Sequence, residues 1–162
     1  MLDINCGMNI EKYPYRLKWV NVLYEFESIG PRGVIKKIVE YKTRRFYQEE
    51  LLNLVVGDWS DLLQRAINDK KSNNRDTDIV LATVASICIE MMSLNPTVRV
   101  LAEGATPARN RLYRIGIVRN WNVIEAMFDI DGFRLGRWEP FQRGVEFNAF
   151  RIKRKENQTQ LF

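Results

Sequence analysis

The residues best suited to chemistry lie between Gly104 and Arg114, where the sequence reads Gly-Ala-Thr-Pro-Ala-Arg-Asn-Arg-Leu-Tyr-Arg. Thr106 is a good N-cap residue and Pro107 suits the first helical position, so the segment predicts a glycine turn followed by a helix. Its three arginines would lie near the helix start, where backbone N–H groups already attract anions. Because guanidinium groups bind phosphate and carboxylate strongly, the segment predicts an anion-binding site.

The spacing of these side chains assigns them to two faces of the helix. Arg111 and Arg114 are three residues apart and share one face, whereas Arg109 and Tyr113 are four apart and share another. Arginines in a first helical turn oppose the helix dipole, which favours acidic groups there. We therefore expect negative charge nearby, and three interpretations stay open: a bound phosphate, a catalytic role, or carboxylates of the protein itself. The candidate carboxylates are Glu103, Asp58, Asp76 and Asp78.

A polar loop precedes the apolar stretch that starts at Ile79. Carboxylates as dense as those of Asp69, Asp76 and Asp78 could hold Mg²⁺ or Ca²⁺. The spacing lacks the glycine and distal glutamate of a calcium loop, and neighbouring basic residues would repel a cation. The loop is therefore interpreted as a solvated turn that caps the next helix, with no metal site. If it lies beside the arginines, Asn74, Asp76 and Asp78 would support their site.

Composition narrows the chemistry further. The chain has 162 residues, no histidine, a net charge of +5 and a pI near 9.3. The lack of histidine excludes Ser-His-Asp and Cys-His nucleophiles and histidine-containing zinc or haem sites. Cys6 and Cys88 are far apart without metal spacing, so neither a disulfide scaffold nor a cofactor is expected. The moderate basic excess favours an anionic partner such as nucleic acid, a phosphorylated ligand or an acidic protein.

Basic and aromatic residues also interleave in two other segments. One is Lys42–Tyr47, and the other contains Arg134, Arg137, Trp138 and Arg143. Sheet faces of this composition suit single-stranded nucleic acid, because bases stack on aromatic rings and phosphates pair with cations. Aromatic residues on strands are more often part of the core, so a structural interpretation stays open beside the nucleic-acid one.

Hydrophobic periodicity predicts several strands and two helices. Alternating side chains from Leu23 predict a hairpin with its turn at Pro31–Gly33, and a central strand is expected over residues 51–59. The stretch 79–94 is apolar on almost every side, which is typical of a buried helix. Further strands are expected over 97–103, 123–130, 133–138 and 145–152, with the arginine helix over 107–119 and a hairpin turn at Asp131–Gly132.

This order predicts an α+β protein with a largely antiparallel sheet, packed by a buried central helix and a second, arginine-bearing helix. The length predicts a single domain over residues 1–162. Residues 1–15 are mixed in character and are interpreted as a loose arm, and residues 153–162 as a frayed tail. No signal peptide or run of about 20 apolar residues is visible, so a cytoplasmic protein outside the membrane is expected.

The segments Asn73–Thr77, Val80–Val84 and Gly104–Arg114 resemble a family of small bacterial proteins classed as a domain of unknown function. The usual pattern there is Ser-Asn-Asn-Gly-Asp, followed by Gly-Ser-Thr-Pro-Ala-Arg-Thr-Arg-Leu-Tyr-Arg. This chain departs from it at Arg75, Ala105 and Asn110. The resemblance covers residues 20–155 or so and implies no activity. It implies only that four residues belong to the family's most distinctive segment: Arg109, Arg111, Tyr113 and Arg114.

A second, looser likeness concerns the first half of the chain. Its expected strands and single helix, with Phe26–Gly33 and Ile38, are similar to single-stranded nucleic-acid-binding repeats of the PUR or Whirly type. Such a likeness of fold is a weak argument for function.

The leading hypothesis is a non-enzymatic module that binds an anionic partner, above all single-stranded nucleic acid. Arg109, Arg111 and Arg114 would hold phosphate, Tyr113 would stack or hydrogen-bond, and Thr106 would cap the helix. The first alternative is a protein-interaction component of a toxin–antitoxin or phage-defence pair, or a homo-oligomer. The second alternative is an enzyme that acts on phosphate-containing substrates.

Overall fold

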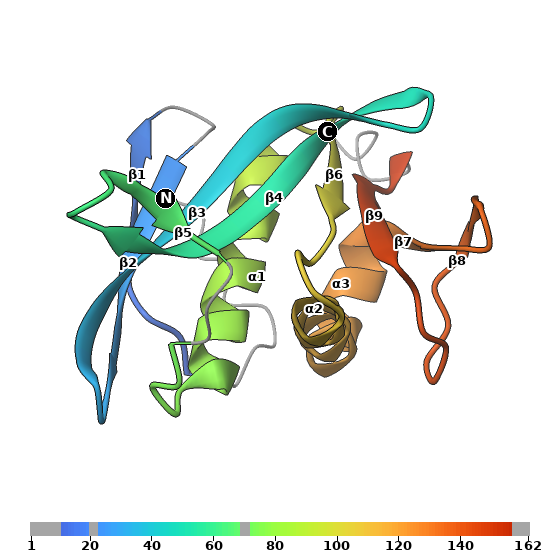
Figure 1. Ribbon diagram of the computed structural model, residues 1–162. Helices are drawn as coiled ribbons and strands as arrows, with labels where there is room; N and C mark the ends of the chain where they lie inside the picture. Colours follow the sequence, from blue (N-terminus) through green and yellow to red (C-terminus); the bar gives the residue numbers. More distant parts are fainter. Residues whose placement is uncertain (1–10, 20–22, 69–71, 157–162) are drawn as a thin grey trace.

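The computed structural model describes residues 11–19, 23–68 and 72–156. Within these residues one sheet curves around three helices (Figure 1). The strands are β1 (Tyr15–Trp19), β2 (Leu23–Gly30), β3 (Gly33–Phe46), β4 (Glu49–Ser60), β5 (Arg65–Ile67), β6 (Arg99–Ala102), β7 (Phe128–Arg134), β8 (Arg137–Pro140) and β9 (Ala149–Arg154). The helices are α1 (Thr77–Leu94), α2 (Pro107–Arg119) and α3 (Trp121–Met127).

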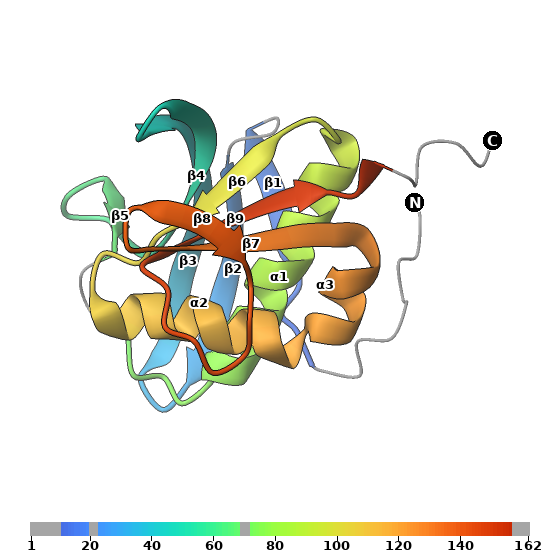
Figure 2. The ribbon, with the colours of Figure 1, turned by 90° about the vertical axis from the view of Figure 1, so that its right-hand side faces the viewer.

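The sheet is antiparallel except at its centre. Its strand order is β1-β2-β3-β4-β6-β9-β7-β8, with β5 paired to the end of β4. The parallel contact between β4 and β6 pairs Leu52 with Val100 and Asn53 with Leu101. Figure 2 shows α2 and α3 following one another on the same side of the molecule. The expected α+β architecture with a largely antiparallel sheet is therefore confirmed.

The long helix α1 is the centre of the main hydrophobic core. Ile87, Met91 and Met92 are buried against the sheet residues Tyr24 and Tyr41. Among the described residues, α1 has the length and apolar composition of a membrane span, with a mean hydropathy of 1.6. Its packing in this core accounts for that composition and is consistent with a protein outside the membrane.

A smaller apolar cluster lies on the opposite face of the sheet. It joins Phe46, Leu101 and Phe133, with Trp138 packed at its side. Successive residues of a strand point to opposite faces, so Leu101 enters this cluster while its neighbours Val100 and Ala102 enter the main core. The sheet thus carries apolar residues on both faces at its centre.

The hairpin turn expected at Asp131–Gly132 is wrong. Both residues lie inside β7, and the turn that leads to β8 is Leu135–Gly136, with φ values of 52° and 77°. Gly132 is required by a close approach instead, since a Cβ atom there would lie 2.2 Å from the ring of Phe147. The Asp-Gly pair resembles a turn sequence, but the glycine is needed for packing against a ring from another part of the chain.

Two expected strands also have to be corrected. Residues 121–127 form α3, because Val123, Ile124 and Met127 are spaced to share one helical face that packs on the core. The last strand begins at Ala149 and not at Val145, although Val145 also packs against the core. Short apolar runs fit either kind of element.

The expected loose arm and frayed tail are partly ordered. The backbone N–H of Tyr13 donates to the Thr83 hydroxyl at 2.9 Å, and Tyr15 begins β1. Lys153 and Arg154 complete β9. The buried Thr83 of α1 holds the first segment, and pairing with the buried Phe128 of β7 holds the second, while residues 1–10 and 157–162 lie outside the described residues.

Candidate anion-binding site

The start of α2 has the expected strand–turn–helix form. Thr106 is extended, with φ −135° and ψ 160°, and its hydroxyl accepts a hydrogen bond from the Arg109 N–H at 3.2 Å. Pro107 occupies the first helical position. Gly104 allows the strand to approach the helix, because a Cβ atom there would lie 2.3 Å from the backbone nitrogen of Asn110. This confirms the local structure predicted from the cap and the glycine.

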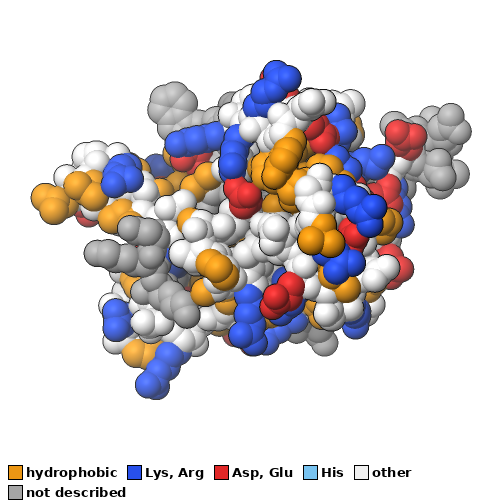
Figure 3. Space-filling model, turned by 45° about the vertical axis from the view of Figure 1, so that its right-hand side comes forward, with side chains coloured by type: hydrophobic (Ala, Val, Ile, Leu, Met, Phe, Trp, Pro, Cys, Tyr) orange, Lys and Arg blue, Asp and Glu red, His pale blue; other side chains and the backbone are white. Residues whose placement is uncertain are grey.

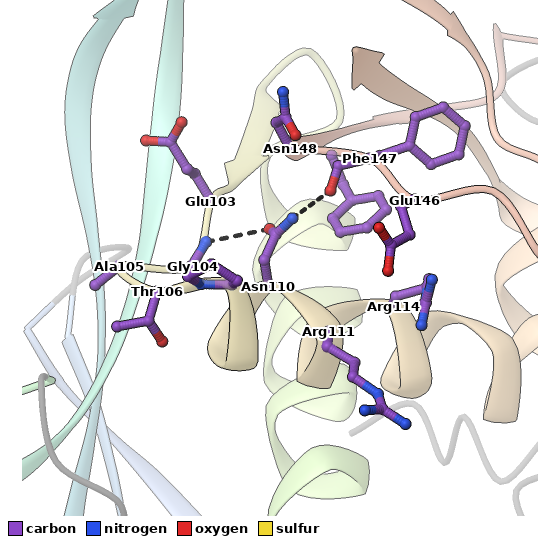
Figure 4. Close-up of a pocket in the computed structure, with 12 residues that line it drawn as sticks. Glu103, Gly104, Ala105, Thr106, Asn110, Arg111, Arg114, Glu146, Phe147 and Asn148 are labelled. Atoms are coloured by element: carbon purple, nitrogen blue, oxygen red, sulfur yellow. Dashed lines mark hydrogen bonds between the residues drawn. The ribbon is translucent and has the colours of Figure 1, made fainter.

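Asn110 fixes this turn to a distant loop. Its side-chain oxygen accepts from the Gly104 N–H at 3.3 Å, and its amide nitrogen donates to the carbonyl of Phe147 (Figure 4). From the sequence, Asn110 stands out only as a departure from the family pattern. Its position inside the expected helix could have indicated this role. Asparagine is a poor helix former, so an asparagine within a helix often makes a side-chain hydrogen bond.

A pocket of about 320 Å³ lies between the start of α2 and the loop before β9. Arg111 and Arg114 line it from the helix, and Glu146 lines it from the loop. Figure 4 shows the Glu146 carboxylate facing Arg114, whereas the Glu103 side chain points away from the helix. The pocket therefore contains two cationic side chains and a carboxylate that would compete with a bound anion for them.

The four carboxylates considered as internal partners for the arginines are all bonded elsewhere. Among the described residues, no ion pair or hydrogen bond joins the side chain of Arg111 or Arg114 to any of them. This observation favours the hypothesis of an external anion for these two arginines. The actual partners are Arg44 for Glu103 at 2.7 Å, Lys37 for Asp58, Ser28 and Tyr13 for Asp76, and Arg119 for Asp78.

Arg109 and Tyr113 share a face as expected, but it is the inner face of α2. The Arg109 guanidinium donates to the carbonyl of Val56 at 3.0 Å. That carbonyl lies on β4 between the residues paired with β6 and those paired with β5, so Arg109 satisfies a backbone group at a gap in the sheet. Burial raises the pKa of Tyr113 to about 12, although Arg109 acts in the opposite direction. Both residues therefore contribute to the packing of α2.

The polar loop before α1 clamps the β2–β3 hairpin. Asn74 is only 2% exposed; its amide donates to the Ser28 hydroxyl at 3.0 Å, and its oxygen accepts from the Arg32 N–H at 2.8 Å. Asp76 accepts from the hydroxyl of Tyr13 at 2.8 Å. The interpretation of this loop as a solvated turn is therefore wrong, because Asn74 and Asp76 are buried and the Asp76 side chain makes no cap hydrogen bond to α1. The described residues hold no cluster suited to a metal ion.

A second, larger cleft separates this loop from α2. It has a volume of about 470 Å³ and lies between α1, α2 and the strands β3 and β4. It brings together five of the expected site residues: Arg109, Arg111, Tyr113, Asn74 and Asp76. Thr106, Arg114 and Asp78 do not line it. Arg111 lines both this cleft and the pocket beside Glu146, so it lies between the two.

The two basic and aromatic segments meet on the outer face of the sheet. The rings of Phe46, Phe133 and Trp138 contact one another with centroids 5.0–5.5 Å apart. Three arginines there are paired with acids: Arg44 with Glu103, Arg134 with Glu139, and Arg151 with Glu49 and Asp131. For the other arginines of the two segments, Arg45, Arg137 and Arg143, no ion pair occurs within the described residues. The rings thus belong to the smaller apolar cluster, and binding of nucleic acid by these segments stays a prediction.

A model of a protein family matches residues 9–155, which is most of the chain. The chain belongs to DUF6934, a family of unknown function. The expected membership of such a family is confirmed, and the DUF6934 match extends to the segment that contains β1. Neither the curated proteins nor the solved structures include a match. The likeness to PUR or Whirly repeats stays a prediction, and DUF6934 brings no activity to this site.

Proposed function

We propose that the protein binds an anionic partner, single-stranded nucleic acid in the first place, through the outer face of α2. The observation that carries the proposal is the state of Arg111 and Arg114. Both residues line a pocket, and in the described part of the chain neither guanidinium group forms an ion pair. Six other arginines do form ion pairs with carboxylates: Arg16, Arg44, Arg99, Arg119, Arg134 and Arg151.

The surroundings of the two arginines favour a short contact with a flexible chain. Figure 3 shows Lys and Arg side chains interspersed with Asp and Glu on this face, in place of one broad basic surface. A rigid duplex needs many phosphate contacts spread over a large interface. A single strand can instead present one or two phosphates to a narrow site and place its bases in the adjoining clefts.

Fluorescence anisotropy with labelled single-stranded DNA, single-stranded RNA and duplex DNA over a series of salt concentrations tests this proposal. The double variant Arg111→Gln/Arg114→Gln should weaken single-strand binding by about tenfold or more. It should also lower the slope of log K against log salt by roughly 1.4, since each lost phosphate contact of a single strand contributes about 0.7.

The control is the paired variant Arg32→Gln/Arg65→Gln, which removes two exposed arginines, of the β2–β3 turn and of β5, that line neither cleft. It should leave the salt slope close to that of the wild type. Equal losses in both double variants would mean that only net charge matters, and a wild-type protein that binds no probe at low salt would end the proposal.

A protein partner is the second candidate function, and exposed apolar residues favour it. Leu62 is 92% exposed and Leu135 is 86% exposed, both in turns at the ends of strands. Leu62 adjoins Leu63, which is 49% exposed, and exposed apolar residues that lie together can form an interface, as in the proposed toxin–antitoxin or phage-defence pair. Light scattering of the purified chain tests the homo-oligomer form of this idea: Leu62→Ser should lower the mass of any oligomer, whereas a monomer at all concentrations removes that form.

A further inference from the structure

The lining of the larger cleft combines two kinds of side chain. Aliphatic side chains come from the two helices, with Val80, Leu81 and Val84 on α1 and Leu112 and Ile115 on α2. Polar and charged side chains come from β3, the loop before α1 and the start of α2, with Lys37, Ser72, Asn73, Arg109 and Arg111. A molecule that fills this cleft should therefore have a weakly polar body and a charged end.

The charges that line the cleft indicate where an anionic group of the occupant would bind. The ammonium of Lys37 is buried, pairs with Asp58 and donates to the Ser72 hydroxyl at 2.8 Å, so its charge is balanced. The Asp76 carboxylate accepts from Ser28 and Tyr13 on the hairpin side. Arg111 is exposed and forms no ion pair among the described residues, so the cleft favours an anion at that position.

The volume limits the size of the occupant. Clefts that bind small molecules usually measure about 300–1,000 Å³, and this one measures about 470 Å³. The aliphatic side chains offer apolar surface for a flat base, and the exposed Arg111 offers a cation for one phosphate. We infer that the cleft takes one nucleoside monophosphate unit, free or as part of a strand. This inference rests on the proposed function and gives it a specific subsite.

Amide chemical shifts of the labelled wild-type protein test the subsite directly. Adenosine 5′-monophosphate should shift the signals of residues 72–84 and 108–115 and leave those of β1 and β8 unchanged. Adenosine or inorganic phosphate alone should produce the same pattern only at concentrations about tenfold higher or more. Equal response to phosphate alone would overturn the inference, because a simple anion site would then account for it.

A variant that fills the cleft provides the second test. Ala108 is exposed at the start of α2 and lines the cleft, so Ala108→Trp adds a large side chain there without replacing a core residue. It should weaken binding of the mononucleotide by about tenfold or more. The matched control is Asn122→Trp, at an exposed position of α3 that does not line the cleft. Wild-type affinity in Ala108→Trp would contradict the inference.

Oligonucleotides separate this inference from the proposed function. If Ala108→Trp binds a single strand as well as the wild type while Arg111→Gln/Arg114→Gln does not, the outer face of α2 binds the strand and the cleft does not. If the mononucleotide binds in the cleft and no strand binds, the subsite stands for a free nucleotide and the proposed partner is wrong. If Ala108→Trp loses the binding of both the mononucleotide and the single strand, the result supports both the subsite and the proposed function.

Discussion

Arg109 and Arg111 are two residues apart on α2 and both line the larger cleft, yet the surroundings of their guanidinium groups differ. The Arg109 guanidinium bonds to the Val56 carbonyl inside the protein, whereas Arg111 faces solvent between the two clefts. A helix turns by about 200° over two residues, so adjacent arginines of one motif necessarily reach different surroundings. The motif therefore combines a structural arginine with arginines available to a partner.

Substitution of each arginine should separate these roles. Arg109→Gln should lower the free energy of unfolding by about 1–3 kcal/mol, because it removes a charged hydrogen bond to a backbone carbonyl. Arg111→Gln should change it by less than about 0.5 kcal/mol, as is usual for an exposed side chain. Urea unfolding curves of the two variants measure the difference, and equal effects would contradict the assignment.

Glu146 is the carboxylate closest in position to compete for Arg114. It is exposed, lines the same pocket and faces the guanidinium in Figure 4. Glu146→Gln should strengthen the binding of an anionic probe severalfold, since a like charge is removed from the site. Anisotropy measures the affinity and a thermal melt measures the stability. A lower melting temperature with unchanged affinity would show that Glu146 and Arg114 serve to stabilise each other.

At the scale of elements, the β7–β8 turn combines two unfavourable features. Leu135 has a positive φ of 52° and is 86% exposed, and Gly136 follows with φ 77°. Two successive residues with positive φ are typical of a type I′ turn, where Asn-Gly is strongly preferred. This left-handed conformation costs a residue with a Cβ atom about 1–2 kcal/mol of conformational free energy, and asparagine tolerates it better than leucine.

Leu135→Asn should therefore stabilise the protein by about 0.5–1 kcal/mol. Thermal unfolding is the measurement, and Leu62→Asn is the matched control, because Leu62 is 92% exposed but is not among the residues with positive φ. An equal gain in both variants would show that loss of exposed apolar surface, and not the backbone conformation, is responsible.

The sequence predicts those elements whose signals are local. The α1 core helix and the start of α2 follow from periodicity, the Thr106 cap and Pro107. The role of Gly132 could not be predicted, because the ring that requires it belongs to Phe147, fifteen residues later in the chain. The polar loop was recognised, but its binding to the β2–β3 hairpin depends on Ser28 and Gly33, more than 40 residues earlier.

In the molecule as a whole, a short parallel contact between β4 and β6 joins the strands β1 to β4 to the strands β6 to β9. Only two residue pairs connect β4 to β6 in the described residues, and helices α1 and α2 pack beneath this contact. The gap beside it is where Arg109 bonds to β4 and where the larger cleft opens. The candidate site thus follows from the topology, since a fully paired sheet would leave no polar backbone group for the arginine.

The ion pairs of the buried Glu25 make the free energy of unfolding depend on pH. Glu25 has a side chain only 4% exposed and is surrounded by Arg16, Lys18 and Lys36. Burial would raise the pKa of Glu25, but hydrogen bonds from Lys36 and Arg16 outweigh it and hold that pKa below its usual value. A carboxylate with a lowered pKa stabilises the fold above its unfolded pKa, and this contribution is lost as the pH falls through the folded pKa.

Glu25→Gln should therefore lower the free energy of unfolding by about 1–3 kcal/mol at pH 7. The difference from the wild type should shrink as the pH falls below the usual pKa of a glutamate, because Glu25 of the wild type then takes up a proton and loses the same ion pairs. Urea unfolding at a series of pH values measures it, with Glu27→Gln as the control because the Glu27 side chain is exposed and has no such cluster in the described residues. A difference that stays constant between pH 7 and pH 3 would mean that the shape of Glu25, and not its charge, stabilises the sheet.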